Sequence, residues 1–134
     1  MIYDFDTAEC LARSPVTALS IGMRLRGMIG RDFSPEMDAM IFPRCSAVHT
    51  FFMRIDLDVL FLDASGVVAG VRRNLPPWRP WAGARRAVTT VEFPAGTLRN
   101  VEPGHRILLN EEPDRETARA MRRQAMSETG MVTP

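Results

Sequence analysis

The sequence contains no lysine, and all seventeen of its basic residues are arginines. Without a lysine amine, enzymes that form a Schiff base or use a lysine nucleophile are excluded. Sixteen acidic residues balance the arginines and leave a formal net charge of +1 at pH 7. A charge this close to zero gives no general reason to bind nucleic acids or membranes. Any electrostatic function must therefore come from a local group of charges.

Cysteines and long apolar stretches are also scarce. Two cysteines are too few for a disulfide framework, so we expect free thiols and a cytoplasmic protein. No apolar run approaches the roughly 18 residues that cross a membrane. The acidic start, MIYDFDTAEC, has no apolar core of a secretory signal. We therefore expect no membrane partner.

Cys10, Cys45, His49 and His105 are all the cysteines and histidines of the chain, and four such ligands would suit zinc. If residues 45–49 form one strand, however, Cys45 and His49 lie roughly 13 Å apart. That distance is too long for a shared ion or for a Cys45–His49–Asp58 nucleophile set. We therefore predict no metal, no cofactor and no catalytic residue.

The 134 residues are enough for one domain, and 46% hydrophobic with 25% charged residues is typical of globular proteins. Alternating apolar patterns and turn residues predict a mostly β fold, a small antiparallel barrel-like domain over residues 1–110. The clearest element is a β-hairpin over 57–72, which turns at Asp63-Ala-Ser-Gly66. Strands are expected at 2–6, 39–42, 48–53, 57–62, 67–72, 87–93 and 106–109.

One or two short helices complete the prediction. Ser14 as N-cap and Pro15 in the first turn favour a helix over 15–24. The tail, residues 111–134, is expected to be helical or loose, with Asp114 as N-cap. Three apolar residues on one face of this tail suggest only a marginal helix. They are Ala118, Met121 and Ala125.

A loop over 74–84 separates two of the expected strands and holds three prolines and two tryptophans. Between Asp63 and Glu92 the chain has no acidic residue. Basic residues interleaved with tryptophan are typical of surfaces that bind phosphates and stack on rings. This basic stretch contains Arg72, Arg73, Arg79, Arg85 and Arg86.

Four segments, in this order, carry a family resemblance: RLRGMIGR at 24–31, CSAVHTFFMRIDLD at 45–58, LPPWR at 75–79 and FPAGT at 93–97. From about Leu11 to Leu109 the chain resembles the prokaryotic family DUF192, a domain of unknown function. The resemblance implies a compact, β-rich, barrel-like domain with short helical insertions, and no established activity, cofactor or substrate. The sequence departs from the family pattern at Ala39, Asp56 and His105, where Gly, Pro and Asp are usual.

We interpret the meeting of 44–58 with the Trp/Arg loop, 72–86, as the functional face. Its role is expected to be non-catalytic binding of a small anionic ligand or a protein partner in a cleft. Asp58 is expected to pair with Arg54 or Arg26, either to fix a turn or to bind a ligand. The candidate ligand-binding residues are Arg26, His49, Thr50, Arg54, Asp58, Trp78 and Arg79.

Two alternatives stay open. A small hydrolase-like enzyme would require a hydrogen bond between His49 and Asp58 inside a pocket. Weak binding of nucleic acid or phosphate would require a continuous positive strip with both tryptophans exposed. Nucleic acid is the less favoured partner, and nothing in the sequence specifies an oligomeric state.

Overall fold

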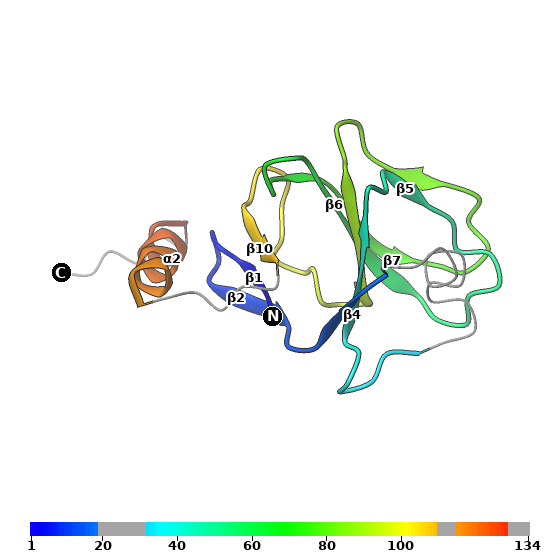
Figure 1. Ribbon diagram of the computed structural model, residues 1–134, viewed down its shortest axis with the longest axis horizontal. Coiled ribbons are helices and arrows are strands. Elements are labelled where there is room, and N and C mark those ends of the chain that lie inside the picture. The colour runs from blue at the N-terminus through cyan, green and yellow to red at the C-terminus, as the bar shows by residue number, and fades with distance from the viewer. Residues whose placement is uncertain (19–31, 110–114, 129–134) are drawn as a thin grey trace.

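The computed structural model describes residues 1–18, 32–109 and 115–128, and strands dominate its architecture (Figure 1). The mostly β class with a short helix is confirmed, although the described strands form three sheets and no closed barrel. The strands are β1 (Ile2–Asp4), β2 (Glu9–Ala12), β3 (Pro15–Thr17), β4 (Ala39–Pro43), β5 (Ala47–Val48), β6 (Leu57–Leu62), β7 (Val68–Leu75), β8 (Ala82–Gly83), β9 (Thr89–Pro94) and β10 (Ile107–Leu109), and the helix is α2 (Arg115–Glu128).

The central sheet has the strand order β3-β4-β9-β6-β7 and is antiparallel except for the β3–β4 pair. All six residues of β6 are buried, because strands flank it on both edges and apolar layers cover both faces. The predicted hairpin over 57–72 is formed by β6 and β7. Asp63 closes its turn by accepting hydrogen bonds from the backbone N–H groups of Ser65 and Val67.

Two apolar layers lie on opposite faces of the central sheet. The first layer packs against the sheet β10-β1-β2 and includes Ile2, Leu60, Val91 and Leu98. The second layer includes Met53, Val59, Phe61 and Ala82, with Val48 of β5 packed on its margin. Because side chains alternate along a strand, β4 and β6 contribute to both layers.

The helix predicted over 15–24 is wrong at its start. Residues Pro15–Thr17 form β3, which pairs with β4 in parallel, Val16 lying opposite Met40. The Ala18 N–H continues this pairing to the Ile41 carbonyl. Pairing with a strand distant in sequence overrides the local capping signal here. Residues 19–24 lie outside the described residues.

The strand predicted over 48–53 is also largely wrong. Regular pairing covers only Ala47–Val48, which lies opposite β8. The chain then turns, with the Met53 N–H donating to the Thr50 carbonyl and a φ of +62° at Phe52. Alternation of apolar and polar residues suggested a strand, whereas the hydrogen bonds of Thr50 to another loop dictate a turn.

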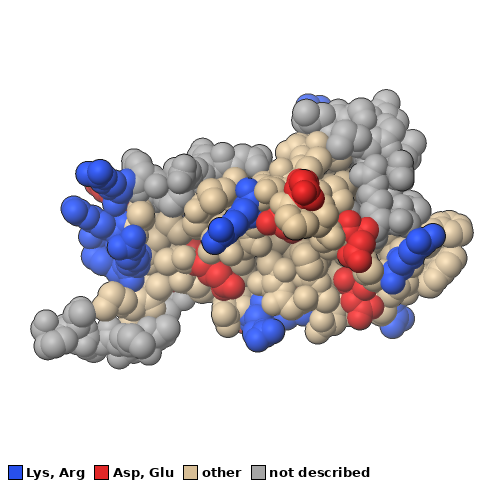
Figure 2. All heavy atoms as spheres, turned by 90° about the horizontal axis from the view of Figure 1, so that it is seen from below, with Lys and Arg blue, Asp and Glu red and all other residues tan. Residues whose placement is uncertain are grey.

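The C-terminal tail contains α2, a helix with one buried side and one basic side. Met121 is 2% exposed, and Ala118 and Ala125 are half-buried. Basic side chains gather at the end of the molecule where α2 lies, away from β5 (Figures 1 and 2). The described part of the chain holds no helix with the length and apolar content needed to span a bilayer. The exposed arginines of α2 are Arg115, Arg119, Arg122 and Arg123.

Candidate functional site

Thr50 joins the turn after β5 to the Trp/Arg loop. Its side chain is buried, and its Oγ1 donates to the Pro76 carbonyl at 2.7 Å and accepts from the Arg79 N–H at 2.7 Å. Its backbone N–H donates to the Arg79 carbonyl at 2.9 Å, and its carbonyl accepts from the Trp78 N–H at 2.8 Å. Four hydrogen bonds therefore fix the two segments relative to each other.

Around Thr50, four rings form the aromatic patch, defined as His49, Phe51, Phe52 and Trp78. Ring centroids are 5.2 Å apart for His49 and Phe51, and 6.3 Å apart for Phe51 and Trp78. Phe52 meets Trp78 edge-on at 4.9 Å, a favourable arrangement for aromatic pairs. The rings thus form one connected surface rather than separate exposed residues.

The rings of this patch are exposed to an unusual degree. Phe52 is 64% exposed and Trp78 59%, and on the same loop Trp81 is 65% exposed. Burying a large apolar side chain contributes about 1.5–3 kcal/mol to folding. A chain that leaves three such side chains in solvent forgoes that stabilisation, which is typical of surfaces that bind a partner.

The backbone beneath the patch is strained. Phe52 and Trp78 have φ angles of +62° and +67°, in the left-handed region that bulky residues rarely adopt. Such a conformation costs on the order of 1–3 kcal/mol and persists only where the surroundings impose it. The hydrogen bonds of Thr50 impose it here, and the result is that both rings point outward.

Two arginines border the patch. Arg54 and Arg79 are exposed and form no ion pair within the described residues. The side chain of Arg73, in the same basic stretch, is bound to other parts of the domain. Its guanidinium donates to the carbonyls of Leu98 and Val101 and pairs with Glu102. The positive strip required for nucleic-acid binding is therefore interrupted at Arg73.

Asp58 does not lie in this site. It is 1% exposed and faces the first layer, where it accepts three backbone hydrogen bonds. The Asn74 N–H donates to Oδ1 at 2.9 Å, and the N–H groups of Gly96 and Leu98 donate to Oδ2 at 3.0 and 2.8 Å. The predicted pairing with Arg54 is wrong, because backbone amides take the place of a guanidinium. Asp58 therefore anchors loops.

The arrangement does not support the hydrolase-like alternative. His49 is exposed, and its Nδ1 accepts from the Phe51 N–H at 3.3 Å, while the Asp58 oxygens are occupied by amides. No hydrogen bond among the described residues joins His49 to Asp58. Both cysteines are free thiols, and each Sγ contacts a carbonyl of its own segment. Arg26 lies outside the described residues.

Sequence reasoning missed Glu92. It lies in β9 opposite Met40 and Val59, faces the second layer and is 4% exposed. Its Oε2 has no hydrogen-bond partner among the described residues, and burial raises the pKa of this carboxyl to about 8. The carboxyl is therefore mostly protonated at pH 7. Its position in an alternating strand gave no signal, because the sequence does not show that both faces of β9 are covered.

Comparison with known proteins fits this picture of a β domain with an unassigned site. The family DUF192, described as an uncharacterized ACR, matches residues 16–109, which is more than half of the chain. The protein belongs to this family. Because the family is uncharacterized, membership assigns no activity, substrate or cofactor to the protein, and its function has to be inferred from the site.

Two archaeal UPF0127 proteins are similar to this DUF192 chain. One, from Pyrococcus horikoshii, is 36% identical over 58 residues, which cover 43% of this chain and 50% of the relative. The other, from Thermococcus kodakarensis, is 30% identical over 76 residues, covering 57% of this chain and 48% of the relative. The matched region thus spans about half the length of these relatives.

Two solved structures share the fold. A protein of unknown function from Novosphingobium aromaticivorans superposes with a TM-score of 0.63 at 20% identity, covering 73% of this chain and 75% of that one. A putative transcription regulator from Sinorhizobium meliloti gives a TM-score of 0.60 at 24% identity, covering 69% and 78%. At these identities the likeness shows the fold alone.

Proposed function

We propose that this DUF192 protein is a non-catalytic binding module whose aromatic patch recognises an acidic, partly apolar segment of a partner protein. The observation that carries the proposal is the outward display of Phe52 and Trp78 on strained backbone. The two free thiols support a cytoplasmic place of action.

The form of the patch favours a protein over a small molecule. Small ligands are usually enclosed in concave pockets, whereas the rings of Phe52 and Trp78 are each more than half exposed. Aromatic residues and arginine are the types that dominate binding energy at protein interfaces. Arg54 and Arg79 at the border, with no acidic residue between Asp63 and Glu92, favour acidic groups on the partner.

A selection from a library of displayed random peptides tests this function. Wild type and the double variant Phe52→Ser, Trp78→Ser are used as targets, and recovered peptides are titrated by intrinsic fluorescence. Both tryptophans of the chain lie on the loop concerned, so indole emission reports directly on the site. We expect acidic, apolar peptides whose Kd rises about 10-fold or more in the double variant.

The matched control is Val88→Ser, because Val88 is an exposed apolar residue, 42% accessible, outside the patch. It should leave peptide binding unchanged. Peptides that bind wild type and the double variant equally, or that show no bias toward Asp and Glu, would contradict the proposal. Saturable fluorescence changes with citrate or inorganic phosphate alone would instead indicate a small-anion site.

Nucleic acid is the second candidate, because both tryptophans are exposed as that alternative required. Single-stranded oligonucleotides bind such surfaces by stacking on indole rings and pairing with arginine. This candidate predicts quenching of tryptophan fluorescence by oligo-dT with an affinity that falls steeply as salt is raised. Tryptophan fluorescence that does not change when the oligonucleotide is added, or quenching that does not weaken as salt is raised, would exclude this candidate.

A further inference from the structure

At the end of the molecule opposite β5, the first and last strands bring together three potential metal ligands. Asp4 ends β1, Asp6 lies in the turn that follows, and His105 precedes β10. The antiparallel pairing of β1 with β10 continues to Phe5, whose N–H donates to the Arg106 carbonyl at 2.8 Å. One ligand atom from each of the three side chains lies within 4.8 Å of the others.

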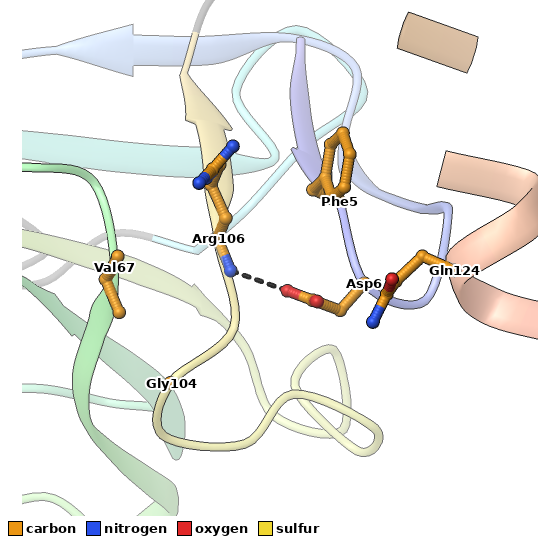
Figure 3. A pocket seen from close by; sticks show the side chains of 6 residues that line it. All are labelled: Phe5, Asp6, Val67, Gly104, Arg106 and Gln124. Carbon is orange, nitrogen blue, oxygen red and sulfur yellow. Dashed lines mark hydrogen bonds between the residues drawn. The ribbon is translucent and has the colours of Figure 1, made fainter. Parts of the chain in front are cut away.

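The hydrogen bonds around these donors hold them in place. Asp4 is fully buried, with its Oδ2 2.8 Å from the Nδ1 of His105 and its Oδ1 accepting from the Asp6 N–H at 3.0 Å. Asp6 in turn accepts the Arg106 N–H on Oδ2 at 2.7 Å (Figure 3). Such fixed partners are what orient the ligands in metal sites.

The charges of this cluster favour a cation. Two carboxylates have ligand atoms within 4.8 Å of each other, and that of Asp4 is buried with the imidazole of His105 beside it. A buried carboxylate is costly unless it is compensated, and one imidazolium can compensate only one of the two charges. A divalent ion would neutralise both.

The cluster also opens onto a cavity. Asp6 forms part of the wall of a cavity of about 270 Å³, which reaches from the β1–β2 turn to α2 (Figure 3). A water molecule occupies roughly 30 Å³, so the cavity has room for several. An ion bound at the cluster would therefore keep coordination positions for water. The lining residues are Phe5, Asp6, Val67, Gly104, Arg106 and Gln124.

We propose that Asp4, Asp6 and His105 form a binding site for a divalent first-row transition ion, of which Zn²⁺ and Mn²⁺ are the probes. Ligand atoms about 2.0–2.2 Å from one ion are roughly 3 Å from each other. The Asp4–His105 contact, at 2.8 Å, is already at that separation. One imidazole nitrogen and two carboxylates suit such ions better than Ca²⁺, which takes oxygen ligands only.

Isothermal titration of the chelator-treated full chain with ZnCl₂ and MnCl₂ tests the site, with CaCl₂ for comparison. We expect one ion per chain for Zn²⁺ and Mn²⁺, and a Kd that rises about 10-fold or more in Asp6→Asn and His105→Asn. His49→Asn removes the other histidine and Cys10→Ser a thiol, and both should bind as wild type does. Equal binding in all four variants, or no binding to wild type, overturns the proposal.

A second measurement needs no variant and covers the case in which His105→Asn fails to fold. Mn²⁺ broadens proton resonances of nearby groups, and the two histidines of the chain give separate ring signals. At substoichiometric Mn²⁺ we expect the ring protons of His105 to broaden while those of His49 stay sharp. Equal broadening of both rings, or broadening of His49 alone, would place the ion elsewhere and refute the site.

Discussion

The two faces of the central sheet differ in how well their buried acids are hydrogen-bonded and in how strained the nearby backbone is. On the face of the first layer, the buried acid of β6, Asp58, has backbone donors for both of its oxygens. On the face of the second layer, one oxygen of Glu92 has no hydrogen-bond partner in the described part of the chain, and the loops above hold Phe52 and Trp78 in a strained conformation. Departures from the most stable arrangement gather at functional sites, so the second face is where the proposed partner binding is to be sought.

The largest effect is expected on the first face, from Asp58→Ala. The substitution leaves the N–H groups of Asn74, Gly96 and Leu98 without their acceptor. Each unsatisfied buried group costs about 1–3 kcal/mol, so we expect a loss of about 3–5 kcal/mol in the free energy of unfolding. Urea denaturation followed by circular dichroism measures it.

Asp56→Ala is the control for Asp58→Ala, because Asp56 is an exposed acid two residues away. It should change the free energy of unfolding by less than about 0.5 kcal/mol. If Asp58→Ala proves as mild as Asp56→Ala, Asp58 is no loop anchor, and the contrast between the two faces fails.

On the second face, Glu92→Gln should stabilise the protein and flatten its pH dependence. The pKa of Glu92 is raised by burial from 4.5 to about 8, so the folded state retains a proton that the unfolded state releases. The free energy of unfolding of wild type should therefore fall as pH rises from about 4.5 to 8. Since one pKa unit is worth ~1.4 kcal/mol, the upper limit is near 5 kcal/mol.

In practice we expect a gain of about 2–4 kcal/mol from Glu92→Gln at pH 8 and a much smaller gain at pH 4.5. Denaturation curves at a series of pH values measure this difference. Glu36→Gln, at an exposed glutamate, serves as the matched control and should follow wild type throughout. If the free energy of unfolding of Glu92→Gln depends on pH in parallel with that of wild type, the Glu92 carboxyl is ionised and hydrogen-bonded in the folded protein, which contradicts the prediction.

The sequence predicted the elements of this fold that depend on local pattern. The hairpin over 57–72 follows from an apolar run, a turn rich in Asp, Ser and Gly, and a returning strand. It did not predict β3, because Pro15 and Ser14 mimic a helix start and only the pairing with β4 overrides that signal. Nor could it show that Asp4 and His105 meet, since that contact depends on the pairing of β1 with β10.

The candidate site was predicted in part. The segments 44–58 and 72–86 do meet, with Thr50 as the residue that joins them. Assigning Asp58 to the same face was wrong, because β6 presents it to the first layer, and strand parity could not be followed across the turn at 49–56. Phe52 was overlooked because positive φ in a phenylalanine leaves no trace in composition or periodicity.

The smallest effect on stability is expected from Phe52→Gly. This substitution tests whether the strained backbone at Phe52 serves to display the ring for binding or to pack it for stability. Glycine adopts a φ of +62° without the steric cost that phenylalanine pays, which favours the folded state, although its greater freedom when unfolded offsets part of that gain. Because the ring is 64% exposed, little packing is lost. We expect stability unchanged or higher by up to about 1 kcal/mol, measured by urea denaturation.

Binding should respond in the opposite direction. The same Phe52→Gly protein should lose about 10-fold or more in affinity for the peptides selected on wild type, because the edge-on contact with Trp78 is gone. If the strain at Phe52 is retained because the exposed ring binds a partner, removing the ring should weaken binding while stability stays unchanged or rises. If Phe52→Gly instead destabilises the fold by several kcal/mol, the ring serves packing, and the second face is no less optimised for stability than the first.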